Sequence, residues 1–453
     1  MPMATKKVVI IGGGFSGTLT AINLLRHDGP DAVLIERAPQ AGRGTAYSAA
    51  HPDHLLNVRA GNMSAYPDDP GHFARWLAAR TGDCAATFAP RIVYGDYLAE
   101  ELGHAIAAAP QRLRLVRDTA LALETGDTGV AVTLASGGTV TADVAVLAMG
   151  NLPPHAPAPL DPVALGDDLY RGDPWAGDIG EGLGPDDSVL LLGTGLTMVD
   201  AALLLAARGF TGRIIAMSRR GLLPRMHDAA QPPVIPLDDR PPTALSPLVR
   251  AVREAADAIG WRNAVDRLRP FTQSLWCAAS PQEQARFLRH MRPWWDVHRH
   301  RIAPSVAARL DAMRADGRLT ALAAKPVAYQ PEARSVAVDW RGRGSDTVST
   351  LHVRRIVNCT GPQGDLARSS EPLLQGLVAD GHARADICRL GLDVDRAGNL
   401  IGRNGIPNPA LFALGPMTRG AFWEINAVPD IRVQVWAVAR KLANAHWVGG
   451  EGL

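Results

Sequence analysis

A glycine-rich turn near the start of the chain restricts the fold more than any other feature. It follows a run of four β-branched residues, Val8 to Ile11, which is typical of a buried parallel strand. The turn fits the G-x-G-x-x-G pattern and opens an apolar helical stretch. In this pattern the first glycine permits a tight turn, the second lets a pyrophosphate approach the backbone, and the third lets the helix pack on the strand. We therefore predict a dinucleotide site whose cradle consists of Gly12, Gly14, Phe15, Ser16 and Gly17.

An acidic residue stands where the pattern requires one. The next apolar run, residues 32–35, ends at Glu36, about 20 residues after Gly14. A carboxylate at this place binds the ribose hydroxyls of an adenosine. Arg37 follows directly, and we assign it to the same site. Because strand, glycines, helix and acid agree, the pattern favours a dinucleotide site over an ordinary glycine turn in an α/β unit.

A second unit of the same kind begins with the strand-like run 189–192. This run leads into Gly193 and Gly195, but Met198 takes the place of the third glycine, so we expect that helix to lie slightly farther from its strand. The next strand ends in two arginines and a serine, with no acid. These residues suit the 2′-phosphate of NADP(H) better than NAD(H), with a solvated basic turn as the alternative. The second predicted site comprises Gly193, Gly195, Leu196, Thr197, Ser218, Arg219 and Arg220.

Composition argues against several function classes. The formal net charge of +2 indicates neither a nucleic-acid patch nor an acidic partner. The four cysteines are scattered without a C-x-x-C motif, so the sequence predicts no disulfide framework, no metal site and no dithiol redox centre. Glycines interrupt the apolar start, unlike a signal peptide, and no apolar run is long enough for a membrane helix. We expect a cytoplasmic protein that binds neither nucleic acid nor membrane.

Weaker patterns describe the rest of the chain. Alternating apolar residues in 113–116, 120–123 and 130–134 predict a small antiparallel ribbon. A proline-rich stretch, 151–162, predicts a linker. Helical periodicity after residue 224 includes a basic run from Arg292 to Arg301. This run is either a solvated basic face or a cap that meets an anionic substrate or the cofactor phosphates.

Two dinucleotide units in one chain resemble the two-dinucleotide-binding-domain flavoproteins. Over nearly its whole length, the chain is also similar to a bacterial FAD/NAD(P)-binding family, and this similarity is carried by residues 42–48, 56–58, 218–224, 411–416 and 424–432. The resemblance implies FAD in the first unit, NADPH in the second, and a return of the chain to the FAD domain at its end. It also implies further cofactor contacts at Gly44, Thr45, Asn57, Met63, Gly150, Gly361, Gly415, Pro416 and Glu424.

The predicted fold class is therefore α/β, with two Rossmann-like dinucleotide-binding domains, for FAD and NADPH, and a helical insertion in the second. The predicted FAD domain has an N-terminal part, 1–165, and a C-terminal part, 366–453. The predicted NAD(P)H domain spans 185–365, with the insertion at 224–320.

A more distant similarity relates the chain to the flavin-containing and N-hydroxylating monooxygenases. Their asparagine and their methionine–aromatic–proline–acid run occur here as Asn57, Met63, Tyr66, Pro67 and Asp68. In the flavin-containing monooxygenases this asparagine lies by the reactive edge of the flavin, which makes Asn57 the candidate catalytic residue. A loop asparagine that caps backbone groups is the alternative.

Two departures separate the chain from these relatives. The F-x-G-x-x-x-H motif of the ketone-oxidising monooxygenases is absent between the two units. Pro416 stands where many relatives have the aspartate that binds the flavin ribityl chain. Backbone contacts would have to replace that aspartate, or the flavin would be held less tightly.

The resemblance implies an NADPH-dependent FAD oxidoreductase. The leading reaction is monooxygenation by a C4a-oxygenated flavin, with dioxygen as co-substrate and a nitrogen or sulfur centre on a small molecule as substrate. Two alternatives stay open: an NAD(P)H:flavin electron-transfer reductase or oxidase without oxygen insertion, and a flavin-binding scaffold with degenerate catalysis.

Overall fold

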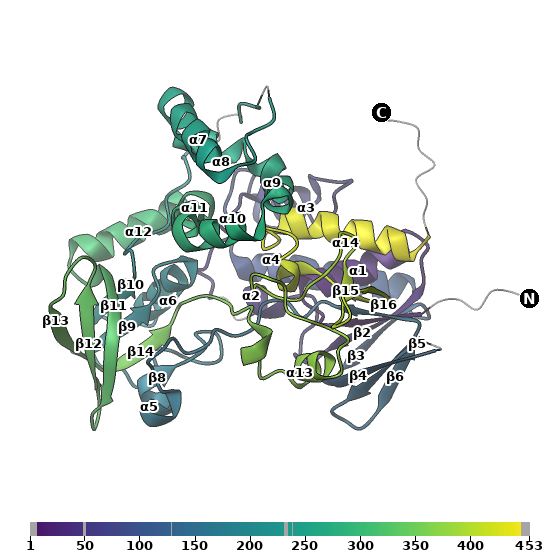
Figure 1. Cartoon of the computed structure of the whole chain (residues 1–453), viewed down its shortest axis with the longest axis horizontal. Coiled ribbons are helices and arrows are strands. Elements are labelled where there is room, and N and C mark those ends of the chain that lie inside the picture. Colours follow the sequence, from purple (N-terminus) through teal and green to yellow (C-terminus); the bar gives the residue numbers. More distant parts are fainter. Residues whose placement is uncertain (1–6, 49–50, 128, 231–233, 238, 445–453) are drawn as a thin grey trace, which may run out of the picture. The chain divides into compact units, whose positions relative to one another are not determined.

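The computed structural model describes residues 7–48, 51–127, 129–230, 234–237 and 239–444. The chain divides into two compact units, whose elements are labelled in Figure 1. The first unit comprises Met1–Ala50, Val58–Leu152 and Gly364–Leu453, and the second comprises His51–Asn57 and Pro153–Gln363. The N-terminal part of the first unit thus ends at Leu152, ahead of the predicted domain end at residue 165. The reason is that the next strand, β8 (Tyr170–Arg171), pairs with β14 (Arg355–Asn358) of the second unit.

A six-stranded sheet forms the centre of the first unit, in the order β15-β16-β7-β1-β2-β3. Neighbouring strands run parallel except for the edge pair β15–β16. β1 is central, and its residues from Val8 to Ile11 are at most 5% exposed, as the β-branched run predicts. The strands are β1 (Lys7–Ile11), β2 (Asp31–Glu36), β3 (Leu113–Arg117), β7 (Val144–Leu147), β15 (Asn399–Ile401) and β16 (Pro407–Ala413).

Helix α1 (Phe15–Arg26) follows the first glycine turn and is buried from Phe15 to Leu24. This burial follows from its position, because α1 contacts β1, β2 and two further helices, α4 (Arg91–Ala108) and α14 (Val428–Leu442) (Figure 1). The C-terminal stretch therefore returns to the first unit twice, as strand β16 and as helix α14. The other helices of this unit are α2 (Gly44–Ser48), α3 (His72–Thr81) and α13 (Pro372–Ala379).

The antiparallel ribbon of the first unit differs from the prediction. β4 (Ala120–Gly126), β5 (Gly129–Leu134) and β6 (Thr139–Ala142) form a three-stranded antiparallel sheet. The predicted first strand of the ribbon is instead β3, which pairs in parallel with β2. A short alternation of apolar residues suits either an edge strand of a parallel sheet or a ribbon strand, so the pattern alone did not distinguish them.

A seven-stranded sheet forms the centre of the second unit, in the order β13-β12-β11-β10-β9-β14-β8. β9 has parallel neighbours on both sides, and α6 (Leu196–Ala207) follows the second glycine turn. The strand–turn–helix–strand arrangement of the first unit thus recurs. The remaining strands are β9 (Ser188–Leu192), β10 (Arg213–Ser218), β11 (Leu319–Pro331), β12 (Val336–Gly342) and β13 (Val348–Val353), of which β11, β12 and β13 pair antiparallel.

The helical insertion lies between β10 and β11 in the chain. Its helices are α7 (Leu245–Ile259), α8 (Trp261–Asp266), α9 (Thr272–Ala278), α10 (Pro281–Arg286), α11 (Arg292–Arg299) and α12 (Pro304–Ala315). A π-helical turn, Phe287–Met291, joins α10 to α11. The predicted linker 151–162 leads into helix α5 (Pro162–Leu169), which begins inside the proline-rich stretch. Over the described part of the chain, no helix is both long and apolar enough to cross a membrane.

Candidate functional site

The first glycine turn has the geometry that requires glycine. Gly12 has φ +103°, and a Cβ added to it would lie 2.5 Å from the carbonyl oxygen of Ala148, at the end of β7. A Cβ on Gly17 would lie 1.8 Å from the carbonyl oxygen of Gly12. Both contacts involve backbone atoms, so neither position accepts a side chain without displacing the turn. The close approach of α1 to β1 therefore depends on the first and third glycines of the motif.

The second glycine of the motif packs against a loop that follows later in the chain. A Cβ on Gly14 would lie 3.4 Å from the Cα of Gly44, and the Gly42 N–H donates to the Gly13 carbonyl at 2.8 Å. The loop that starts at Gly42 and the glycine turn thus face one another. This loop leads into α2, where burial raises the pKa of the Tyr47 phenol to about 12. The neutral phenol can donate a hydrogen bond at the edge of the site.

Glu36 is fixed at the end of β2 by two backbone donors. Its Oε2 accepts from the Gly13 N–H and its Oε1 from the Ala38 N–H, both at 2.6 Å. The residue is only 8% exposed, so these bonds satisfy a buried carboxylate. The carboxylate therefore lies directly at the glycine turn, as the spacing predicts.

A cavity of about 270 Å³ lies within the first unit at the carboxyl ends of β1, β2 and β7. Ligands bind at this edge of open α/β sheets. Predicted site residues that line it are Gly12, Gly14, Phe15, Ser16, Glu36, Arg37, Gly44, Thr45, Gly150 and Pro416. Further lining residues, which no sequence motif indicates, include Arg43, Tyr47, Asp118, Thr119, Glu371, Asn426, Val428 and Ile431.

The far wall of this cavity is formed by the loop before α14. Gly415 has φ +74°, and a Cβ on it would lie 2.4 Å from the Ser16 hydroxyl. Its N–H donates to Gln434 Oε1 at 2.8 Å, while Gln434 Nε2 donates to the Thr418 hydroxyl at 3.1 Å. Gln434 thus holds the loop that places Pro416 in the wall. Val428, at the first turn of α14, also lines the cavity, so the backbone N–H groups of a helix N-terminus lie beside it.

Five residues predicted to contact FAD do not line the cavity: Gly17, Gly415, Met63, Glu424 and Asn57. Gly17 and Gly415 instead shape the backbone around it, as described above. Glu424 is 4% exposed with φ +72°. Asn57 belongs to the second unit, where its carbonyl oxygen lies 2.9 Å from His227 Nε2.

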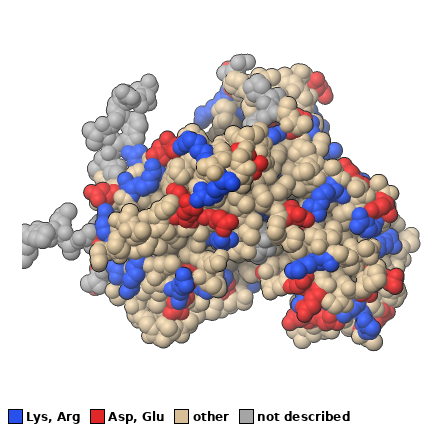
Figure 2. Space-filling model, turned by 180° about the vertical axis from the view of Figure 1, so that it is seen from behind, with Lys and Arg blue, Asp and Glu red and all other residues tan. Residues whose placement is uncertain are grey.

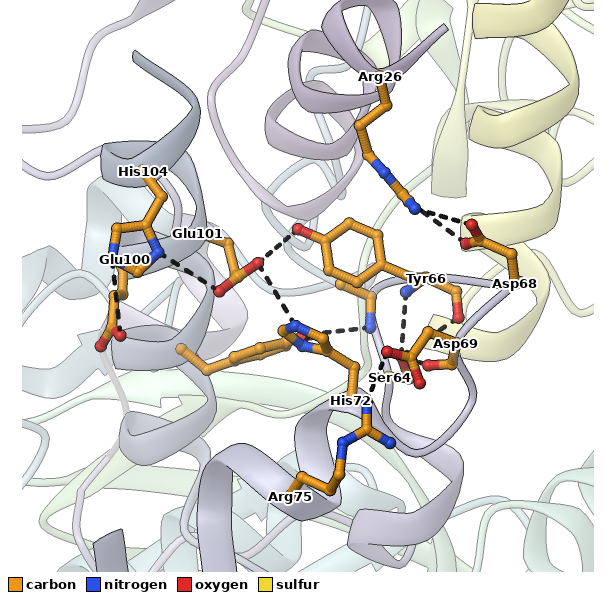
Figure 3. Close-up of polar contacts among 12 residues, drawn as sticks. Arg26, Ser64, Tyr66, Asp68, Asp69, His72, Arg75, Glu100, Glu101 and His104 are labelled. Atoms are coloured by element: carbon orange, nitrogen blue, oxygen red, sulfur yellow. Dashed lines mark hydrogen bonds and ion pairs between the residues drawn. The ribbon is translucent and has the colours of Figure 1, made fainter. Parts of the chain in front are cut away.

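Met63 is 3% exposed. The residues that follow it in the chain, among them Tyr66 and Asp68, belong to a cluster of polar contacts (Figure 3). In this cluster the Tyr66 hydroxyl donates to Glu101 Oε2 at 2.5 Å. The Arg26 guanidinium pairs with Asp68 at 2.7 Å and lies 4.4 Å from the centre of the Tyr66 ring. Burial and the bond to Glu101 raise the pKa of Tyr66, which therefore stays a neutral donor. These contacts fix the segment from Met63 to Asp68 against the first unit.

The second glycine turn repeats the geometry of the first. Gly193 has φ +118°, and a Cβ on it would lie 2.2 Å from the carbonyl oxygen of Cys359, at the end of β14. A Cβ on Gly195 would meet no heavy atom within 4 Å among the described residues. Met198, in place of the third glycine, is fully buried. Gly195 thus presents open backbone at the start of α6, which is where a dinucleotide phosphate would approach.

The turn after β10 is held by hydroxyl groups. Thr194 Oγ1 donates to the Leu222 carbonyl at 2.6 Å and lies 2.8 Å from the Ser218 hydroxyl, which accepts from the Gly221 N–H at 3.0 Å. Ser218 therefore shapes the turn. Arg219 is exposed, and within the described residues its guanidinium makes no ion pair. It is a cation available to a ligand at the end of β10.

The other predicted residues of this unit lie around the same turn. Arg220 Nη2 donates to the His290 carbonyl in the π-helical turn at 3.4 Å. Leu196 and Thr197 form the half-buried first turn of α6. Gly361 follows β14 with φ +90°. These predicted residues lie at or just after the carboxyl ends of β9, β10 and β14.

The basic run of the insertion is neither uniformly solvated nor uniformly available to a ligand. The Arg301 guanidinium is 5% exposed, pairs with both carboxylate oxygens of Asp266 at 2.8 and 2.9 Å, and lies 4.9 Å from the centre of the Trp261 ring. Arg292 pairs with Asp296 at 3.3 Å. On the face shown in Figure 2, cationic and anionic side chains are interspersed rather than gathered by sign. Arg301 is thus a structural residue that holds the insertion together.

Comparisons with known proteins agree with this architecture. Residues 9–152 match the model of a family described as FAD-NAD(P)-binding. A structure of the ornithine N-hydroxylase of Kutzneria sp. 744 with reduced FAD, NADP⁺ and L-ornithine is similar, with a TM-score of 0.66 at 15% identity, over 98% of this chain and 100% of that chain. The L-lysine 6-monooxygenase of Pseudomonas syringae gives a TM-score of 0.67 at 17% identity, over 97% and 99% of the two chains.

Reductases are also similar, but less closely. The thioredoxin reductase of T. acidophilum gives a TM-score of 0.53 at 12% identity, over 97% of this chain and 99% of that chain. A search of curated protein sequences gives no match. At these identities the structural similarity establishes the fold alone. Residues 9–152 are thus similar to the FAD-NAD(P)-binding family, and the chain has the fold of the two-dinucleotide-binding-domain flavoproteins.

Proposed function

We propose that this chain is an NADPH-dependent FAD monooxygenase that hydroxylates a nitrogen centre of a small substrate. The observation that carries this proposal is the pair of glycine turns. In each turn a nearby backbone carbonyl leaves no room for a side chain on the first glycine. The first turn lies beside Glu36, and the second precedes a strand that ends at Arg219 and Arg220. The similar solved structures include hydroxylases of ornithine and lysine. When bound, the two cofactors supply the hydride and the oxygen-transfer chemistry, and the protein supplies binding, orientation and a dry site.

The cavity of the first unit fits the adenosine and diphosphate part of FAD. Glu36 would accept hydrogen bonds from the ribose hydroxyls, because its carboxylate already lies at the turn. The first N–H groups of α1 and of α14 would face the phosphates and the flavin. Pro416 lines this cavity in the position where relatives have an aspartate, so the α14 backbone would replace that contact.

The second unit fits NADPH. Gly195 leaves open space at the start of α6 for the diphosphate, and Arg219 offers an exposed guanidinium at the end of β10 for the 2′-phosphate. Arg220 is held by the His290 carbonyl beside it. These residues would bind the cofactor and leave the chemistry to it.

Asn57 remains the proposed residue at the reacting edge of the flavin, on the strength of the motif order shared with the flavin-containing monooxygenases. Its backbone is held through His227, so the side-chain amide is placed by a fixed segment. An amide there would donate a hydrogen bond and exclude water from the reacting atoms.

The test starts from the purified protein with bound flavin, reduced by NADPH without oxygen. The reduced protein is then mixed with oxygenated buffer containing L-ornithine, L-lysine or cadaverine, and hydroxylamine product and hydrogen peroxide are both quantified. Hydroxylated amine in proportion to NADPH consumed supports the proposal. Stoichiometric peroxide with every amine tested would instead indicate a reductase or oxidase, the class to which the similarity with thioredoxin reductase points. Bound flavin that NADPH does not reduce would indicate a scaffold.

A further inference from the structure

An ion pair joins two walls of the first cavity that are far apart in the sequence. Arg37 follows β2, and Glu371 stands immediately before α13. Both residues line the cavity. Arg37 Nη1 lies 3.0 Å from each carboxylate oxygen of Glu371. The carboxylate is 17% exposed and the guanidinium 56%, so the pair lies where the cavity opens to solvent.

Helix capping does not explain why residue 371 is glutamate. Glu371 is the N-cap residue of α13, yet its side chain makes no capping hydrogen bond. Serine, threonine, aspartate and asparagine are the residues that cap a helix through their own side chain, and glutamate is not among them. Here the side chain extends to Arg37 instead. The positive end of the α13 dipole also favours a carboxylate at this position.

The backbone that carries Glu371 is well fixed. The Glu371 N–H donates to the Ser369 hydroxyl at 3.2 Å, and the side chain of Gln375 donates to the Ser369 carbonyl at 2.9 Å. On the next turns of α13, Leu374 and Leu377 are each 1% exposed and pack in the core of the unit. The fixed backbone thus presents a carboxylate that pairs with an arginine side chain more than half exposed.

We propose that Glu371 is a positioning residue, which holds the Arg37 guanidinium over the adenosine end of the cavity so that it binds the adenosine diphosphate half of FAD. Glu36 marks this end, because the acid after the second strand binds the adenosine ribose, and Arg37 is its neighbour. A planar guanidinium can stack on an adenine and donate to phosphate oxygens. Restraining it beforehand lowers the conformational entropy lost on binding. This inference rests on the proposed FAD site.

The test compares ligands that contain the adenosine diphosphate half with one that lacks it. Dissociation constants of FAD, ADP and FMN are measured on the full-length chain after flavin removal, by fluorescence quenching and competition. We expect E371Q to weaken FAD and ADP by about three- to tenfold and to leave FMN unchanged. A purely structural role for Glu371 would weaken all three ligands alike and would overturn the proposal.

Further variants show whether Glu371 acts through Arg37. R37Q should weaken FAD at least as much as E371Q, and the double variant R37Q/E371Q should bind no more weakly than R37Q, because the two changes remove one interaction. Additive losses would contradict the proposal. D393N is a matched control, since it breaks the Arg384–Asp393 pair in the same C-terminal stretch, away from the cavity. It should leave FAD binding unchanged.

The outcomes separate this inference from the proposed function. If E371Q binds FAD as tightly as the wild-type protein does, the inference about Glu371 is wrong, while the proposed function stands. FAD-loaded protein that NADPH does not reduce removes the proposed function while the binding result still decides the role of Glu371. If E371Q does not fold, R37Q and R37K decide the matter, because Arg37 is exposed: R37K should restore FAD binding only in part, since an ammonium group lacks the planar fork.

Discussion

Substitution by alanine should have different effects at the two glycines of the second turn: G193A should lower the melting temperature, and G195A should weaken NADPH binding. A Cβ on Gly193 would lie 2.2 Å from a backbone oxygen, which is about 1 Å closer than an ordinary van der Waals contact. Its φ of +118° is also one that alanine rarely adopts. Backbone strain of about 1–3 kcal/mol and overpacking of about 1–3 kcal/mol give a loss of about 4 kcal/mol for G193A. For a unit of this size that corresponds to a melting temperature lower by about 8–16 °C.

G195A is the matched control for the steric reasoning. Gly195 has φ −87°, which alanine adopts readily, and an added Cβ would meet no atom of the described residues within 4 Å. We expect an unchanged or slightly higher melting temperature, because alanine restricts the unfolded chain. The methyl group would instead occupy the space needed by the NADPH diphosphate and raise the KM for NADPH about tenfold or more, which is about 1.4 kcal/mol.

Two measurements on the full-length variants check this pair: thermal unfolding followed by circular dichroism, and the rate of flavin reduction against NADPH concentration. G193A that melts at the wild-type temperature would refute the steric argument. G195A with an unchanged KM for NADPH would show that the open space at this turn is not the cofactor site. Both results together would remove the structural basis for a dinucleotide in the second unit.

Three further variants test other parts of the structure. R219A should raise the KM for NADPH about 10- to 100-fold in steady-state kinetics and leave NADH unaffected, because a charged hydrogen bond to the 2′-phosphate is lost; equal losses would remove the reason for preferring NADPH. N57A should bind and reduce flavin normally but release more hydrogen peroxide per NADPH consumed, and unchanged peroxide would exclude Asn57 from the reacting edge. Hydrogen bonds, chiefly from Arg354 and also from Arg355, lower the pKa of Asp168 in the folded protein. Its carboxylate therefore contributes to the unfolding free energy above the unfolded pKa of about 3.9. This contribution disappears as the pH falls through the lower pKa of the folded state. Acid denaturation curves of D168N should lack that part of the pH dependence below about pH 4, and curves parallel to the wild type would contradict it.

Local chemistry explains which parts of the fold the sequence predicted. The glycine turns and the helix after each turn form one continuous motif of adjacent residues, and Glu36 follows the first turn at the spacing that this motif requires. Helix α5 has a local signal as well, because Asp161 precedes Pro162 and accepts the Val163 N–H as an N-cap. The boundary between the two units, at residues 152 and 153, falls inside the proline-rich stretch predicted as a linker.

Other parts depend on contacts that no local pattern contains. Glu371 reaches the cavity from a position 334 residues after Arg37, and its glutamate looks unremarkable beside a proline in the sequence. β3 pairs with β2 although the chain between them contains the helices α2, α3 and α4. The interior position of Arg301 depends on Asp266 and Trp261, which lie on helix α8, earlier in the insertion. Each of these required the folded arrangement, because the partner residue is distant in the chain.

The order in which the chain alternates between its units has a consequence for its synthesis. The second unit is complete once residue 363 has left the ribosome, and its two ends are already joined, since the Asn358 side chain donates to the His155 carbonyl at 2.9 Å. The first unit begins earlier but lacks β16 and α14 until residues 407–442 emerge. The later-starting unit can therefore fold first, while the free edge of β7 stays open to mispairing until β16 has been synthesised.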